Sequence, residues 1–128
     1  MQVRQRVGYC PQFDALIDKM TVYESLVMYA RLRGLKKAEI YDVVDHLIVK
    51  LQLYDFENKL AGNLSGGNKR KLSTAIALVG NPPVVFLDEP TSGMDPVARR
   101  HLWNALIEVR CSGQTIILTS HRYFHYKT

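Results

Sequence analysis

The sequence predicts an α/β fold built on a parallel sheet, because two strand-length apolar runs flank one helical segment. Residues 84–87 (VVFL) and 115–119 (TIILT) lack a strict apolar–polar alternation, which predicts strands buried on both faces. The helix between them begins with Asp95 as N-cap and Pro96 as its first residue, and it ends at Gly113. Two strands joined by such a helix lie parallel, with a right-handed crossover. The apolar residues of the helix recur at helical spacing: Leu102, Ala105, Leu106 and Val109.

A strand end and a helix open the chain. Residues 7–10 (VGYC) form a short apolar segment that Pro11 stops, as at the end of a strand. Thr21 and Glu24 have the spacing of a capping box, which starts a helix that Gly34 ends. The apolar face of this helix is predicted to comprise Val22, Leu26, Tyr29 and Ala30.

Two more helices complete a helical block ahead of the first apolar run. One spans about residues 38–51, with a buried stripe of Val43, Val44, Leu47, Ile48 and Leu51. Residues 60–64 are expected to form a loop, after which Ser65 caps the next helix. The sequence NPP at residues 81–83 ends that helix, because proline has no N–H to continue it. Its inward positions are Leu72, Ala75, Ile76 and Val79.

The composition is that of a globular domain, with 47% hydrophobic and 23% charged residues. No apolar run approaches the roughly 20 residues of a membrane-crossing helix, and the first residues lack the apolar core of a signal peptide. Cys10 and Cys111 do not have metal-binding spacing, which indicates free thiols in a reducing compartment. We therefore expect a cytosolic protein or a cytosolic part of a membrane protein.

The net charge of +5 suits an anionic partner such as a nucleotide, a nucleic acid or a lipid headgroup. The densest basic cluster is residues 69–71 (KRK), and a smaller one is formed by Arg99 and Arg100. Neither cluster is interleaved with aromatic residues, as a groove for single-stranded nucleic acid would be. Both are therefore interpreted as solvated helix faces, and no nucleic-acid partner is expected.

Two adjacent carboxylates, Asp88 and Glu89, directly follow the first apolar run. Ligands of α/β sheets bind beyond the carboxyl ends of the strands. There, one carboxylate can hold Mg²⁺ beside a nucleotide and the other can activate a water molecule. Taken alone, a surface acidic pair is an equally good interpretation.

Ser65, Gly66 and Gly67 begin a helix, where free N–H groups and the helix dipole favour an anion. The two glycines let a phosphate approach the backbone closely. An ordinary glycine-rich helix start remains the alternative. Gln12 follows Pro11, and His121 lies just beyond the second apolar run, near Glu89 if the two strands are neighbours.

Together these segments resemble the motifs of one family. Residues 64–68 (LSGGN) resemble the signature of ABC transporters, residues 84–89 their Walker B segment, and residues 92–96 (SGMDP) their D-loop. Gln12 falls at the position of the Q-loop glutamine, and His121 at that of the switch histidine. The order of the motifs agrees throughout the chain. The resemblance implies a P-loop NTPase-like ABC ATPase fold with ATP and Mg²⁺ as cofactors.

The resemblance also implies roles at the chain's own nucleotide. Asp88 would hold Mg²⁺ through water, and Glu89 would be the general base. Gln12 would touch the metal or the attacking water, and it would relay the state of the membrane part. His121 would contact the γ-phosphate.

Two such domains sandwich two ATP molecules head to tail in this family, so that each signature serves the partner's nucleotide. The resemblance implies that Ser65, Gly66 and Gly67 bind the nucleotide held by the opposing domain. Asp95 would lie at the same nucleotide interface and help to join the two domains.

The wording GYCPQFDAL at residues 8–16, with NKRKL at residues 68–72, is most similar to the A subfamily, whose members are mostly lipid exporters. This implies a helical subdomain at about residues 14–61, and signature, Walker B, D-loop and switch histidine within residues 62–121. The implied partners are a second nucleotide-binding domain and the transmembrane domains of a transporter. The implied location is the cytoplasmic face of a membrane.

One motif of the family is absent from these 128 residues. A phosphate-binding loop needs GxxxxGK[ST] between a strand and a helix. Residues 62–67 have the glycine spacing, but Asn68 replaces the lysine and no strand is predicted before them. Residues 122–128 also differ from the usual continuation of the family. The fold is therefore expected to be incomplete: a helical subdomain plus part of the parallel-sheet core.

Without the phosphate-binding loop, residues 1–128 alone are expected to bind ATP very weakly and to show no useful turnover. Exposed sheet edges and apolar surface are expected as well. The alternative is a non-catalytic truncated module that binds partner domains or supplies the signature in trans. A soluble ABC protein acting on ribosomes or in DNA repair is disfavoured by the wording of residues 8–16.

Overall fold

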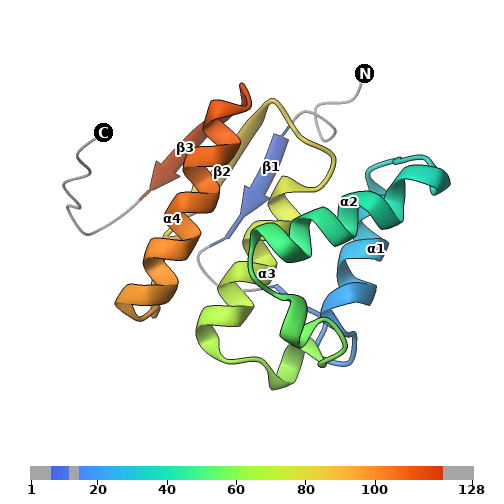
Figure 1. Cartoon of the computed structure of the whole chain (residues 1–128), viewed down its shortest axis with the longest axis horizontal. Coiled ribbons are helices and arrows are strands. Elements are labelled where there is room, and N and C mark those ends of the chain that lie inside the picture. Colours follow the sequence, from blue (N-terminus) through green and yellow to red (C-terminus); the bar gives the residue numbers. More distant parts are fainter. Residues whose placement is uncertain (1–6, 12–14, 120–128) are drawn as a thin grey trace.

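The computed structural model describes residues 7–11 and 15–119, and it shows a small parallel sheet with helices packed against it (Figure 1). The predicted α/β class is confirmed. No helix of the described part is both long and apolar enough to cross a membrane. The elements, in chain order, are β1 (Val7–Cys10), α1 (Val22–Leu32), α2 (Lys37–Lys50), the 3₁₀ turns η2 (Tyr54–Phe56) and η3 (Ala61–Asn63), α3 (Gly66–Leu78), β2 (Val84–Asp88), α4 (Pro96–Cys111) and β3 (Thr115–Thr119).

The three strands are parallel and lie in the order β1-β2-β3. Both connections run in the same direction across the sheet, so right-handed crossovers place α3 and α4 on the same face. The strand residues that are buried beneath these helices include Gly8, Cys10, Val85 and Leu87. Because all strands point the same way, their carboxyl ends meet at one edge of the sheet.

The three predicted helix N-caps are confirmed. The Thr21 hydroxyl accepts a hydrogen bond from the Glu24 N–H at 3.1 Å, and the Glu24 carboxylate accepts one from the Thr21 N–H at 3.0 Å. These hydrogen bonds hold the pKa of the Glu24 carboxyl below its ordinary value. Ser65 caps α3 and Asp95 caps α4 in the same way, each accepting a backbone N–H with its side-chain oxygen.

The predicted apolar stripes form the core between the helices and the sheet. Most of the predicted positions are buried, whereas Tyr29, Val43 and Ile76 are only half-buried. Ile40 of α2 is buried too, although no stripe predicted it. The predicted loop at residues 60–64 contains η3, and no strand precedes α3 there, which supports the rejection of a phosphate-binding loop at this place.

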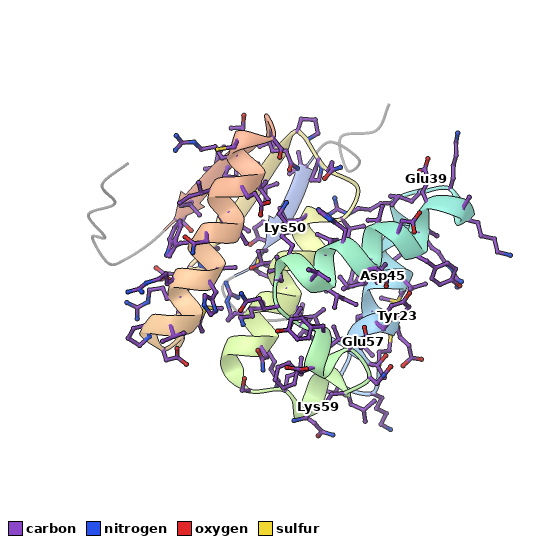
Figure 2. All side chains as sticks on the ribbon, viewed as in Figure 1. Tyr23, Glu39, Asp45, Lys50, Glu57 and Lys59 are labelled. Carbon is purple, nitrogen blue, oxygen red and sulfur yellow. The ribbon has the colours of Figure 1, made fainter. Side chains whose placement is uncertain are left out.

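Helices α1 and α2 form a block to one side of the sheet (Figure 1), joined through Tyr23. The Tyr23 N–H donates to the Glu57 carbonyl at 3.0 Å, and its ring stacks on Tyr41 with centroids 6.5 Å apart. Burial raises the pKa of the Tyr23 phenol, and the neighbouring Asp45 raises it further. Figure 2 shows Tyr23, Asp45 and Glu57 gathered where α1, α2 and the turn after α2 meet.

The second face of the sheet is open in the described part of the chain. Tyr9, Phe86 and Ile117 are paired across the three strands in register, and they are 58%, 37% and 42% exposed. The prediction of burial on both faces is therefore wrong for these strands, because the two crossover helices cover only one face. The prediction of exposed apolar surface is confirmed.

We expect Gly8→Ala to destabilise the fold by about 1–3 kcal/mol or more, because α3 lies directly on β1. A Cβ atom at Gly8 would lie 2.0 Å from the backbone oxygen of Ala77, so the helix would have to move off the strand. Urea denaturation measures the loss. The matched control is Gly66→Ala, where a Cβ meets nothing within 4 Å; equal midpoints for the two variants would contradict the packing.

Candidate functional site

The carboxyl ends of β2 and β3 are joined by two hydrogen bonds. Thr119 Oγ1 donates to Asp88 Oδ1 at 2.5 Å, and the Glu89 N–H donates to the Thr119 carbonyl at 2.9 Å. Asp88 and Thr119 are also partners in the strand register. The predicted carboxylate pair thus lies at the sheet edge where ligands of parallel sheets bind.

Glu89 has a left-handed backbone conformation, with φ of 51°. This region is uncommon for residues other than glycine, and such strain is concentrated at functional sites. Neighbouring groups hold the conformation: the Glu89 carbonyl accepts hydrogen bonds from Ser92 N–H at 3.1 Å and from the Arg70 guanidinium at 2.9 Å. The chain therefore turns at the second carboxylate of the pair, and these hydrogen bonds hold the turn.

Arg70 connects α3 to the residues at the carboxyl ends of β1 and β2. Its guanidinium donates to the backbone oxygens of Pro11 at 2.6 Å, Asp88 at 2.9 Å and Glu89 at 2.9 Å. The residue is 4% exposed, and its neighbour Lys71 is 8% exposed. The interpretation of residues 69–71 as a solvated helix face is therefore wrong for both, because α3 is packed against neighbours on almost every side.

The first turn of α3 leaves space where a ligand could approach. The Ser65 hydroxyl accepts the Asn68 N–H at 3.2 Å. A Cβ atom at Gly66 would meet nothing within 4 Å, and one at Gly67 would meet only Met94 at 3.9 Å. Packing within the described part of the chain does not require these glycines, and they leave room for an external group to come close to the backbone.

This turn and the segment before α4 share one hollow of about 550 Å³, here named the α3 hollow. Asp95 lies on its wall, with Oδ1 accepting the Ala98 N–H at 2.8 Å. Asp88 and Glu89 are not among its lining residues. The structure thus brings the predicted residues together as two separate groups. The residues that line the α3 hollow include Ser65, Gly66, Gly67, Lys71, Asp95 and His101.

The two remaining predicted residues, Gln12 and His121, lie outside the described part of the chain. Strands β2 and β3 are neighbours, and the Glu89 N–H donates to the carbonyl of Thr119, the last residue of β3. The position of His121 relative to Glu89 stays a prediction. No sequence pattern pointed directly to Arg70 and Lys71 as site residues.

Asp88 suits a magnesium ion that is shared with a nucleotide. Mg²⁺ takes oxygen ligands and is usually held by one or two carboxylates together with waters and substrate phosphates. The described residues contain no cluster of three or more His, Cys, Asp and Glu that would form a site by itself. A single half-buried carboxylate, oriented by Thr119, fits the shared arrangement.

Comparison with known families identifies the family of this chain. The profile of the family described as "ABC transporter" matches residues 1–92. This chain belongs to the ABC transporter family. The matched range includes the signature (residues 64–68), the Walker B segment (84–89) and the start of the D-loop. The parallel sheet with its helices is accordingly part of an ABC ATPase fold, as predicted.

Curated relatives also support the predicted A subfamily. Human "Phospholipid-transporting ATPase ABCA3" is 60% identical over 120 residues, covering 94% of this chain and 7% of the relative. Human "Retinal-specific phospholipid-transporting ATPase ABCA4" is 55% identical over 120 residues, and rat "ATP-binding cassette sub-family A member 2" is 54% identical over 121. Each of these two alignments covers 94% of this chain and 5% of the relative. The chain thus spans only a small part of the proteins that it matches.

Proposed function

We propose that residues 1–128 are part of the ATP-binding and ATP-hydrolysing domain of a phospholipid-transporting ABC transporter. The observation that carries the ATP-handling proposal is the first turn of α3, where two glycines leave an open approach to backbone N–H groups. Such a helix start favours a phosphate through its dipole and its unpaired N–H groups. The phospholipid substrate is proposed because similar transporters are named for phospholipid transport.

We place metal and water chemistry at the end of β2. Asp88 would hold Mg²⁺ through water, and a bound ion would supply positive charge that neutralises the phosphates. Glu89 takes a proton from the attacking water. Its carboxylate suits this role because Glu89 directly follows the proposed metal-binding residue Asp88. The support is the fixed turn at Glu89, held by Thr119 and Arg70. Gln12 and His121 are proposed to contact the water and the γ-phosphate.

The separation of the two groups supports a head-to-tail pair of domains. Since Asp88 and Glu89 do not line the α3 hollow, the hollow is free to receive the nucleotide of a second domain. Ser65, Gly66 and Gly67 then bind its terminal phosphate, with Asp95 beside them. A second nucleotide-binding domain is therefore a proposed partner.

The transmembrane domains are the other proposed partners, and the cytoplasmic face of a membrane is the proposed location. A groove of about 650 Å³ runs along the helical subdomain proposed at about residues 14–61. It is lined mainly by apolar side chains of α1 and its neighbours, among them Tyr23, Met28 and Leu32, the last 72% exposed. An exposed apolar groove of this kind is typical of a protein-binding surface.

Gly66→Ala tests the phosphate-binding proposal without disturbing the core. In an NMR titration of residues 1–128 with Mg·ATP, we expect saturable shifts of the Gly67 and Asn68 amides, and at least tenfold weaker binding after the substitution. The added methyl group occupies the space that the phosphate needs. Stability should stay the same or rise by about 0.5–1 kcal/mol, because alanine is the better helix former.

Asn63→Ala is the matched control, because this exposed residue lies just before α3 and does not line the α3 hollow. It should bind Mg·ATP as the unsubstituted chain does. Equal affinity of the Gly66→Ala variant, or amides of this turn that do not respond to millimolar Mg·ATP, would overturn the proposed role of the signature.

A further inference from the structure

Lys71 is a buried lysine that faces the α3 hollow. It lies one turn after Gly67 on α3, is 8% exposed, and lines the same hollow as Ser65 and the two glycines. No hydrogen bond or ion pair joins its ammonium to any residue that the structure describes. Buried charges are ordinarily paired, and Lys71 lies where an anion that entered the α3 hollow could pair with it.

The lowered pKa of Lys71 shows that its surroundings disfavour the charged ammonium, and an anion would offset this effect. Burial lowers the pKa of its ammonium, and the nearby Asp95 carboxylate opposes that effect only in part. Asp95 also caps α4, where its Oδ1 accepts the Ala98 N–H. An anion in the hollow would add the missing charge.

The walls of the α3 hollow suit a phosphate in three ways. The N-terminus of α3 points its N–H groups and the positive end of its dipole into this region. The Ser65 hydroxyl and the open glycine turn offer close contact. Lys71 adds a full positive charge at the side of the hollow. Because Asp95 carries a negative charge on the same wall, the net positive charge of the hollow is small, and the N–H groups of α3 must help to hold the anion.

We infer that Lys71 is a phosphate-binding residue of the signature site, pairing with the terminal phosphate of a polyphosphate ligand that enters the α3 hollow. The inference rests on the proposed function and adds the charged residue Lys71 to the phosphate-binding group of Ser65, Gly66 and Gly67. The polyphosphate can belong to a nucleotide or to an inorganic chain, and both present the same terminal group.

The test compares two probes on residues 1–128: ATP and inorganic triphosphate, each followed through the Gly66 and Gly67 amides by NMR. We expect Lys71→Met to weaken both by about tenfold, as loss of one charged hydrogen bond does. Lys71→Arg should restore most of the affinity. Lys69→Met, which removes the same charge from a half-exposed neighbour outside the hollow, should change it less than twofold.

The outcomes separate Lys71 from the rest of the site. Loss with both probes supports the phosphate contact, whereas loss with ATP alone, or with neither probe, overturns it. If the Gly66→Ala variant loses binding and Lys71→Met does not, this inference fails while the proposed function stands. If the unsubstituted chain binds neither probe at millimolar concentration, the proposed phosphate-binding role of Ser65, Gly66 and Gly67 fails as well.

A second measurement needs no substitution. With lysines labelled at Cε, the pKa of Lys71 should rise toward its ordinary value when inorganic triphosphate is added, while that of Lys69 stays constant. A Lys71 pKa that does not respond to saturating triphosphate contradicts the pairing, whatever the stability of the variants.

Discussion

Glu89→Gln is expected to lower ATP hydrolysis about 10²–10⁴-fold, the contribution usual for a general base. The experiment uses a chimera in which residues 7–119 replace the equivalent segment of human phospholipid-transporting ATPase ABCA3, which is 60% identical over 120 residues. Glutamine has the same size as glutamate but cannot accept the proton. The hydrogen bonds of Glu89 with Thr119, Ser92 and Arg70 use its backbone, so they do not depend on the carboxylate.

Glu108→Gln is the matched control, because Glu108 is an exposed carboxylate on α4, away from both site groups. This variant should hydrolyse ATP at the rate of the unsubstituted chimera. Similar rates for the Glu89→Gln and Glu108→Gln chimeras would remove Glu89 from the chemistry. Residues 1–128 alone serve as the background, for which we expect no measurable turnover.

Local chemistry explains why most elements could be predicted from the sequence. Thr21, Ser65 and Asp95 each cap a helix with a side chain that bonds to an N–H three positions later, so the signal lies within one turn. The site carboxylates were predictable for a related reason. A polar residue directly after a buried strand lies at the sheet edge in any parallel fold.

The environment of α3 could not be predicted in the same way. Residues 70–71 read as solvent-facing because lysine and arginine are almost never buried without a partner. The partners of Arg70 include three backbone oxygens from two distant segments, and the position of a backbone oxygen cannot be predicted from the residue type. The weak signal was the run of small residues Ser73, Thr74 and Ala75, which lets neighbours approach α3 on several sides.

The faces of the sheet show a second limit. An unbroken apolar strand is compatible with burial on both sides, but the sequence of one strand does not say what covers each side. Here both crossovers have the same direction, so Phe86 and Ile117 are left on the open face while Val85 is fully buried. The outcome depends on strand order, which is a property of the assembled sheet.

Arg70→Met should have the largest effect on stability, about 3–5 kcal/mol in the free energy of unfolding. Methionine fills much of the space but donates no hydrogen bond, so the oxygens of Pro11, Asp88 and Glu89 lose a charged donor together. That loss is a large fraction of the 5–15 kcal/mol that stabilises a typical domain. Urea denaturation of residues 1–128 measures it.

Two further variants separate the shape of the Arg70 side chain from its charge. Arg70→Lys keeps the charge but lacks the planar fork, so it can serve fewer of the three oxygens and should recover only part of the loss. Lys69→Met removes a neighbouring half-exposed charge and should cost less than about 0.5 kcal/mol. If Arg70→Met unfolds at the same urea concentration as Lys69→Met, the guanidinium does not hold the edge of the sheet. If only Arg70→Met is destabilised, and amide exchange at Glu89 accelerates with it, the same side chain stabilises the fold and fixes the backbone at the proposed general base.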